Sequence, residues 1–145
     1  MVWGAGDRLG TYRGQMISVD LARRLLSEGV LWEPQPGDRF MIDQPTLLDE
    51  VFWISELTID VHTYQGQPIL GFNGTTEWAL DSVTLDKAIW LPREDQLRDL
   101  LGHRFLALNP IEGGWCVTIA TADGDRLFSA GDAEDAYALA LLSFV

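Results

Sequence analysis

The alternation of apolar and polar residues near the middle of the chain constrains the fold more than any other sequence feature. Val51–Tyr64 is the longest strand-like segment, and every second residue over Leu57–Val61 is apolar. This period of two is typical of a strand with one buried and one solvated face. Gln65–Gln67 can then turn the chain into a second apolar run, Pro68–Phe72. The two segments predict an antiparallel hairpin.

Three other segments carry apolar residues at helical spacing. Ser18 is a good N-cap for a helix that Gly29 would end. Pro92 suits the first turn of a helix that continues to Leu101. A closing helix is expected to begin at Asp132 and to bury its apolar residues up to Phe144.

The remaining apolar runs are short and are separated by turn-forming residues. Those that indicate strands are Arg39–Ile42, Arg104–Leu108, Trp115–Ala122 and Arg126–Ser129, the last two joined by an Asp123-Gly124 turn. Thr75–Trp90 fits neither period for long, and we expect short helical turns there. Because most strands are hairpin-linked, the sequence predicts an α+β fold, with a mainly antiparallel sheet and three or more helices on one face.

The length of 145 residues suits one domain. Residues 1–15 include four glycines and show no apolar periodicity, so they are interpreted as an N-terminal extension, either mobile or an upstream start. Residues 16–145 are expected to form a single α+β domain. The single cysteine, Cys116, allows no intramolecular disulfide, and its apolar neighbours indicate a buried strand thiol.

The charge of the chain excludes some partners and favours others. Ten Lys and Arg residues face twenty-two Asp and Glu residues, which gives a formal net charge of −12. Nucleic acid and anionic membranes are therefore not expected as partners, because both are bound mainly through clustered basic residues. A basic protein partner fits this charge, and homo-oligomerisation is left open. Without a segment of membrane-spanning length or a signal peptide, the expected location is cytoplasmic.

Searches for catalytic patterns find little that specifies a reaction. The chain has no Walker loop, no Gly-x-Ser-x-Gly elbow and no His-Glu-x-x-His pair, so no cofactor is predicted and the sequence leans away from an enzyme. The weak alternative is a metal or acid–base site formed by Glu56, Asp60 and His62, which share one face of the long predicted strand. Solvation of an outer sheet face explains the same pattern.

Two stretches are hard to explain by folding alone: Gly71–Ser82, with the sequence GFNGTTEWALDS, and Trp90–Leu97, with the sequence WLPREDQL. Together with Trp32-x-Pro34, Gly37–Phe40 and Asp135–Ala140, they make the chain resemble a family of small, uncharacterised actinobacterial proteins over residues 16–145. Some members carry a pilus-assembly label, but this chain lacks the phosphate-binding loop of the ATPase-like proteins that the label implies. The resemblance implies a source and no activity.

These two stretches also supply the candidate binding residues. Polar side chains beside an aromatic ring are common in contact surfaces, and the start of a helix offers free backbone N–H groups. The candidates are Asn73, Thr75, Glu77, Trp78, Arg93, Asp95 and Gln96. We expect Glu77, Trp78, Arg93 and Asp95 to share one surface, where Arg93 pairs with a ligand carboxylate or with Glu77.

The sequence therefore favours a non-catalytic protein-interaction or regulatory module. The alternative is a small-ligand-binding protein or an unrecognised enzyme that uses the Asn73–Trp78 turn with Arg93, or the strand face that carries Glu56, Asp60 and His62. A third interpretation is a subunit of a larger assembly, because the apolar segment Leu139–Val145 could pack against another chain.

Overall fold

The computed structural model of the chain describes residues 16–47, 50–54, 59–64, 67–72 and 82–145. These residues form helices and antiparallel strands, so the predicted α+β class is confirmed. The described chain divides into two compact units, Trp32–Trp90 and residues 16–31 with Leu91–Val145. The second of these is called the C-terminal unit. The expectation of one domain over residues 16–145 stays a prediction.

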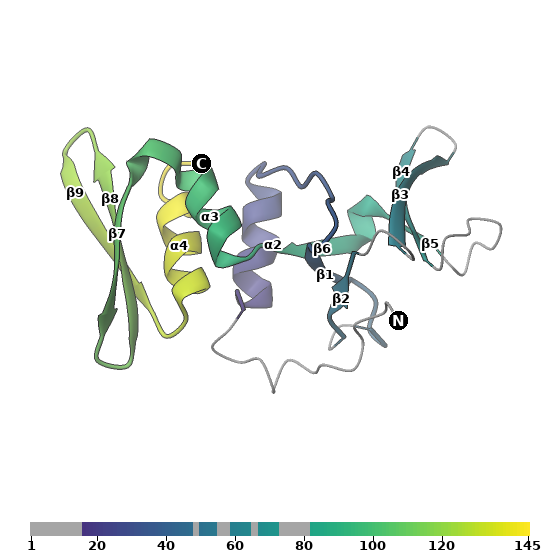
Figure 1. Cartoon of the computed structure of the whole chain (residues 1–145), viewed down its shortest axis with the longest axis horizontal. Helices are drawn as coiled ribbons and strands as arrows, with labels where there is room; N and C mark the ends of the chain where they lie inside the picture. Colours follow the sequence, from purple (N-terminus) through teal and green to yellow (C-terminus); the bar gives the residue numbers. More distant parts are fainter. Residues whose placement is uncertain (1–15, 48–49, 55–58, 65–66, 73–81) are drawn as a thin grey trace. The chain divides into compact units, whose positions relative to one another are not determined.

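The Trp32–Trp90 unit contains two three-stranded sheets (Figure 1). In the first, the strand order is β2-β1-β6, with β1 over Arg39–Ile42, β2 over Phe52–Trp53 and β6 over Ala88–Leu91. In the second, the order is β3-β4-β5, and the strands are Ile59–Tyr64, Gln67–Phe72 and Ser82–Thr84. Tyr64 pairs with Gln67 across the β3–β4 turn, so the predicted hairpin is confirmed.

The core of this unit forms where β1 and β2 pair. Phe40 lies opposite Phe52 in the ladder, and their ring centroids are 5.6 Å apart. Aromatic cross-strand pairs of this kind stabilise a sheet beyond the area they bury. The other buried members of this cluster are Ile42, Ile54 and Ala88, and Trp32 and Leu47 pack against it.

The C-terminal unit is built on one antiparallel sheet in the order β7-β8-β9. β7 (Phe105–Ile111) and β8 (Gly114–Thr121) form a hairpin, and β8 pairs in turn with β9 (Gly124–Ala130). The turn into β9 is Ala122-Asp123, one residue earlier than the predicted Asp123-Gly124 pair, because Thr121 pairs with Gly124. Gly124, the first residue of β9, has φ +111, a conformation that glycine adopts without a steric penalty. The three strand predictions in this region are therefore confirmed.

One helix packs on this sheet, and two further helices pack against that helix. Helix α4 (Ala133–Leu142) contacts β8 and β9, while α2 (Val19–Ser27) and α3 (Glu94–Leu101) contact α4. Figure 1 shows α4 between the sheet and the other two helices. The prediction of one sheet with three or more helices packed on its face is not confirmed in that form. The described residues form three separate sheets, and α4 is the helix with extensive contacts to β8 and β9.

The sequence of α4 explains its central place. Six of its ten residues are buried, and they lie around the whole helix rather than along one stripe: Glu134, Ala136, Tyr137, Ala138, Ala140 and Leu141. A helix that is apolar on all sides has to be covered on all sides. The alanines keep its surface narrow, so a sheet and two helices can approach it closely.

Two regions differ from the sequence prediction. The single strand expected over Val51–Tyr64 is wrong: β2 and β3 belong to different sheets. The reason is visible in the burial of Val51, Phe52 and Ile54, which belong to a buried run without alternation. Of the helical turns expected over Thr75–Trp90, the described residues 82–90 contain one 3-10 turn, Leu85–Lys87, between two strands. Residues 75–81 lie outside the described chain, so the prediction is not tested there.

The helix predictions need smaller corrections. Ser18 caps α2 through its Oγ, which accepts a 3.4 Å hydrogen bond from the Leu21 N–H. The N-cap of α3 is Arg93 rather than a residue before Pro92, so Pro92 precedes the helix. Phe144 lies beyond the end of α4 and is half-exposed instead of buried.

Candidate functional site

Most of the candidate residues lie outside the part of the chain that the structure describes. Asn73, Thr75, Glu77 and Trp78 fall in the segment 73–81, and Glu56 falls in 55–58. Asp60 and His62 lie on β3, where their positions in the ladder are opposite Gly71 and Ile69. The proposed Glu56, Asp60 and His62 site and the surface shared by Glu77 and Arg93 stay predictions.

The described candidates, Arg93, Asp95 and Gln96, lie together at the start of α3. The Arg93 backbone N–H donates to Gln96 Oε1 at 3.0 Å, which is half of a capping box. The Arg93 side chain donates from Nε to Asp95 Oδ1 at 3.1 Å. Burial tends to raise the pKa of Asp95, but the Arg93 hydrogen bond and charge outweigh it, so this pKa lies below its usual value.

This geometry gives all three residues a local role. Gln96 satisfies one backbone group of the helix start, and Asp95 holds the guanidinium beside the first turn of the helix. The pair is partly exposed, with 34% of the Arg93 and 56% of the Asp95 side chain accessible. Exposed pairs of this kind contribute about 0 to 1 kcal/mol, so the arrangement is explained as a helix start without a ligand.

The Asp135–Ala140 stretch also has a structural explanation. Asp135 Oδ1 accepts a 2.7 Å hydrogen bond from the Ser18 N–H, which ties α4 to the start of α2. Tyr137 Oη donates to Glu94 Oε2 at 3.1 Å and ties α4 to α3. Its ring stacks on Phe105 of β7, with the centroids 5.7 Å apart. The polar atoms of this stretch therefore hold α2 and α3 against α4.

Burial raises the pKa of both Asp135 and Tyr137. Burial raises the pKa of Asp135, the Ser18 N–H lowers it, and the neighbouring Asp132 charge raises it again, with a net upward shift. Burial and the Glu94 charge raise the pKa of Tyr137 to about 12. A phenol that holds its proton this firmly acts as a hydrogen-bond donor at neutral pH and is a poor general base.

The Trp32–Asp38 turn explains two further motifs in the Trp32–Trp90 unit. Asp38 is buried, and its Oδ2 accepts hydrogen bonds from Trp32 Nε1 at 2.9 Å and from the Gln35 N–H at 3.0 Å. The Trp32 ring stacks on Trp90, nearly parallel at 7°. Trp90 is only 7% exposed, and its Nε1 has no hydrogen-bond partner within the described chain. The motif thus organises a turn and a tryptophan stack.

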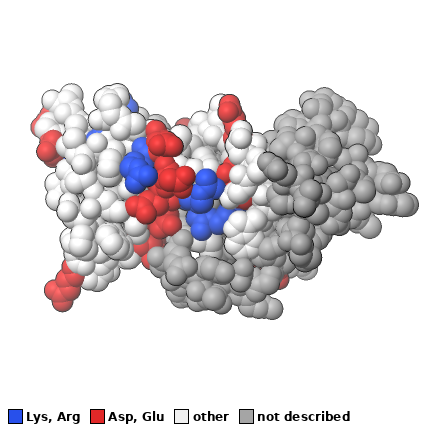
Figure 2. Space-filling view, viewed as in Figure 1, with Lys and Arg blue, Asp and Glu red and all other residues white. Residues whose placement is uncertain are grey.

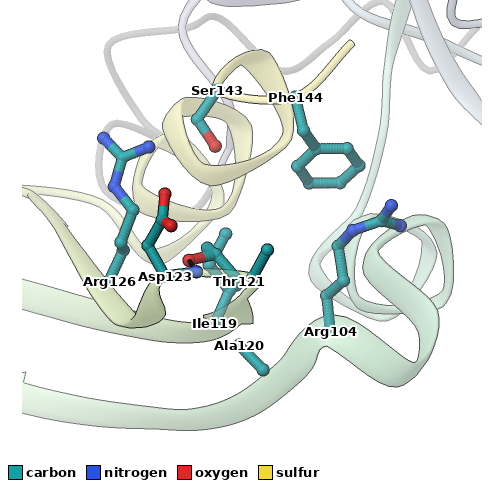
Figure 3. A pocket seen from close by; sticks show the side chains of 9 residues that line it. Arg104, Ile119, Ala120, Thr121, Asp123, Arg126, Ser143 and Phe144 are labelled. Carbon is teal, nitrogen blue, oxygen red and sulfur yellow. Dashed lines mark hydrogen bonds between the residues drawn. The ribbon is translucent and has the colours of Figure 1, made fainter.

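A shallow hollow of about 310 Å³ lies where the end of α4 faces the β8–β9 turn (Figure 3). Arg104 and Arg126 flank it, with the Arg104 guanidinium 4.2 Å from the centroid of the Phe144 ring. The hydroxyl protons are already used: Thr121 Oγ1 donates to the Gly124 carbonyl, and Ser143 Oγ donates to the Ala140 carbonyl.

The hollow does not single out a ligand. The carbonyl end of a helix carries a partial negative charge that favours cations, and the last turn of α4 has no basic residue of its own. Arg104 and Arg126, which come from neighbouring elements, supply positive charge beside this end of the helix. Asp123, which also lines the hollow, would repel an anion that approached the two arginines.

The strand β9 forms an open edge of the sheet in the C-terminal unit. Among the described residues β9 pairs only with β8, in an unbroken register from Trp115 opposite Ala130 to Thr121 opposite Gly124. Its other side leaves a row of backbone N–H and C=O groups without a strand partner in the described chain. Such a row is a template for pairing with another chain.

The exposed side chain at the centre of β9 is Leu127, which is 66% accessible. Leu127 lies opposite Thr118, on the other face of the sheet from Val117 and Ile119, which are 0% accessible. None of the described helices covers this outer face (Figure 1). In the same view, charged side chains gather mainly over the helices, and the sheet is largely uncharged (Figure 2).

Sequence reasoning identified β9 as a strand but not as a candidate site. The signal present in the sequence was the apolar pair Leu127-Phe128 in a short terminal strand whose charged residues, Asp125 and Arg126, lie only at its start. That pattern is also typical of a covered strand. The strand order, which makes β9 an edge, decides between the two cases.

The comparisons with known proteins add no relative. No family model matches the chain, and no curated protein and no solved structure matches it. The resemblance to actinobacterial proteins therefore stays a prediction. Within the described residues, no group of three or more His, Cys, Asp or Glu side chains could hold a metal ion. No helix in that part of the chain is long and apolar enough to span a membrane.

Proposed function

We propose that the protein is a non-catalytic interaction module that binds an extended strand of a protein partner along β9. The observation that carries the proposal is the seven-residue edge of β9 together with the exposed Leu127. Pairing of this kind takes its affinity from backbone hydrogen bonds and its specificity from alternate side chains. Leu127 is the side chain that would contact the partner on the outer face.

The other edge of the same sheet is protected, which strengthens the choice of β9. In β7, Pro110 offers no backbone N–H, and the register shifts between Phe105 and Ala107. Prolines and bulges are devices by which proteins prevent edge-to-edge pairing. β9 contains neither, and its ladder with β8 shows no shift. Charged side chains also discourage edge pairing, but in β9 these are Asp125 and Arg126, which lie only near its start.

The small-ligand alternative has less support from the described residues. Arg93, its main described member, is hydrogen-bonded to Asp95 on the same helix. The turn that would complete such a site lies outside the described chain.

A pair of matched variants tests the proposal. Leu127→Lys places a charge at the centre of β9, and Leu31→Lys makes the same change at a leucine that is 81% exposed and lies outside the sheet. Tagged wild-type and variant chains are incubated with native cell extract, and bound protein is quantified. Hydrogen exchange at residues 124–130 is then measured with and without that protein.

We expect stoichiometric partner on the wild type and on Leu31→Lys, slowed exchange along β9, and loss of the partner from Leu127→Lys. Equal binding to all three chains would contradict the role of β9. A wild-type chain that retains neither another protein nor an untagged copy of itself would overturn the proposed function.

A further inference from the structure

We infer that the strand that β9 receives is the β9 of a second copy of this chain, so that two C-terminal sheets join into one continuous antiparallel sheet. This inference rests on the proposed function, because it names the partner for the same edge. The sequence of β9, its charge and its register carry it.

One register pairs the whole strand with itself. Antiparallel pairing of Gly124–Ala130 about a twofold axis overlaps all seven residues only if Leu127 lies opposite Leu127 of the partner subunit. The two exposed leucines of the outer faces then meet at the axis. Any other register leaves residues of β9 unpaired at one end.

The same register satisfies the remaining side chains. Arg126 comes to lie opposite Phe128 of the partner subunit, which repeats between chains the cation–π contact that Arg126 makes with its own Phe128 at 5.1 Å. Asp125 comes to lie opposite Ser129 of the partner subunit. No two like charges are directly opposite, and directly opposed like charges are the arrangement that destabilises a ladder.

Charge favours this edge as the place where two such chains can meet. The chain carries a formal charge of −12, so two copies repel each other over most surfaces. In β9, Asp125 and Arg126 cancel, and the other five residues are uncharged. A neutral, self-complementary strand is therefore a surface on which a second copy can dock without bringing acidic residues together.

Purified protein in sedimentation equilibrium and light scattering over a concentration series provides the first test. We expect a wild-type dimer, an unchanged dimer for Leu31→Lys, and a dissociation constant at least about tenfold higher for Leu127→Lys, which sets two like charges opposite each other. A wild-type monomer at every concentration, or an undiminished dimer for Leu127→Lys, would overturn the inference.

Disulfide trapping tests the register itself. Opposite residues in an antiparallel pair have Cα atoms about 4.5 to 5.5 Å apart, within the range that a disulfide spans. Leu127→Cys should therefore give a covalent dimer under mild oxidation. Ser129→Cys should not, because the two copies of residue 129 would be about 14 Å apart along the strands. Both variants are made in a Cys116→Ala background, since Ser129 lies opposite Cys116 within the chain.

The two proposals can fail separately. A monomeric purified chain that captures a different protein in a manner that depends on Leu127 would overturn the second copy and leave the β9 docking edge intact. A basic peptide or protein is the expected alternative occupant in that case. Equal trapping of Leu127→Cys and Ser129→Cys would reject the register even if the protein is dimeric.

Discussion

The two faces of the β7-β8-β9 sheet are made from the same strands and have opposite surroundings. On one face, Val117 and Ile119 are completely buried under α4, a helix whose own residues are buried on all sides. On the other face, Leu127 is 66% accessible, and none of the described helices covers it. One-sided covering is usual for an antiparallel sheet, but the solvated side is then expected to be polar.

The difference between the two faces shows which parts of the C-terminal unit contribute to its stability. The covered face is fixed by apolar packing against α4, and two hydrogen bonds hold α4 to the starts of α2 and α3. The outer face and the edge of β9 contribute little to the fold of one chain. An exposed apolar residue on an unguarded edge is therefore better explained by contact with another strand than by folding. Five substitutions in the isolated chain, one of them a matched control on the outer face, test this contrast.

The largest expected effect is on the covered face. Ile119→Ala should lower the free energy of unfolding by about 2 to 5 kcal/mol, because it removes buried methyl groups and leaves a cavity under α4. Leu127→Ala, the matched change on the outer face, should alter the stability of the monomer by less than about 0.5 kcal/mol. Urea denaturation at low protein concentration measures both. Similar losses for the two variants would remove the distinction between the faces.

A smaller effect is expected where α4 contacts α3. Tyr137→Phe removes the hydrogen bond to Glu94 and should cost about 1 kcal/mol of unfolding free energy at pH 7. The difference from wild type should shrink as the pH rises from 10 towards 12. In the unfolded chain Tyr137 ionises near its ordinary pKa of 10.0, whereas in the folded chain it keeps its proton to about 12, so its stabilising contribution is lost in that window.

Urea titrations of wild type and Tyr137→Phe, at one pH below 10 and one between 10 and 12, measure this change. The other tyrosines are common to both chains and cancel in the difference. A difference that stays constant over this range would show that the pKa of Tyr137 is not raised.

Asp135 should give a weaker dependence at acid pH. Its folded pKa lies above the ordinary value of 3.8, so its contribution to stability is complete below that value and is lost as the pH rises through the folded pKa. Asp135→Asn keeps an oxygen that can accept the Ser18 N–H. The stability of wild type relative to this variant should fall as the pH rises from below 3.8 through the folded pKa and should then stay level. An increase over the same range would contradict the direction of the shift.

The smallest effect is expected at the start of α3. Arg93→Ala removes the partly exposed pair with Asp95 and should change the free energy of unfolding by no more than about 1 kcal/mol. Thermal melts at low and high salt check this, since any contribution should weaken with salt. A loss as large as that of Ile119→Ala would place Arg93 in the core packing of the unit.

The sequence alone determined the local elements with strong patterns. Helix α2 follows from its Ser18 cap, the β3–β4 hairpin from alternation, and α4 from a run of apolar residues with acidic residues in its first turn. In each case the deciding residues are neighbours along the chain, so propensity, capping and period agree without tertiary information. The α+β class follows from the order of these elements.

Only the tertiary structure decided which strands share a sheet and which edges remain open. Val51–Tyr64 has the pattern of one strand, but β2 pairs with β1 while β3 pairs with β4, partners that a period of two cannot distinguish. For the same reason, the sequence did not reveal the candidate site. Leu127 has the pattern of an ordinary strand residue, and only the order β7-β8-β9 shows that it lies on an edge strand. Strand order depends on packing between residues far apart in sequence, and the local sequence pattern does not determine it.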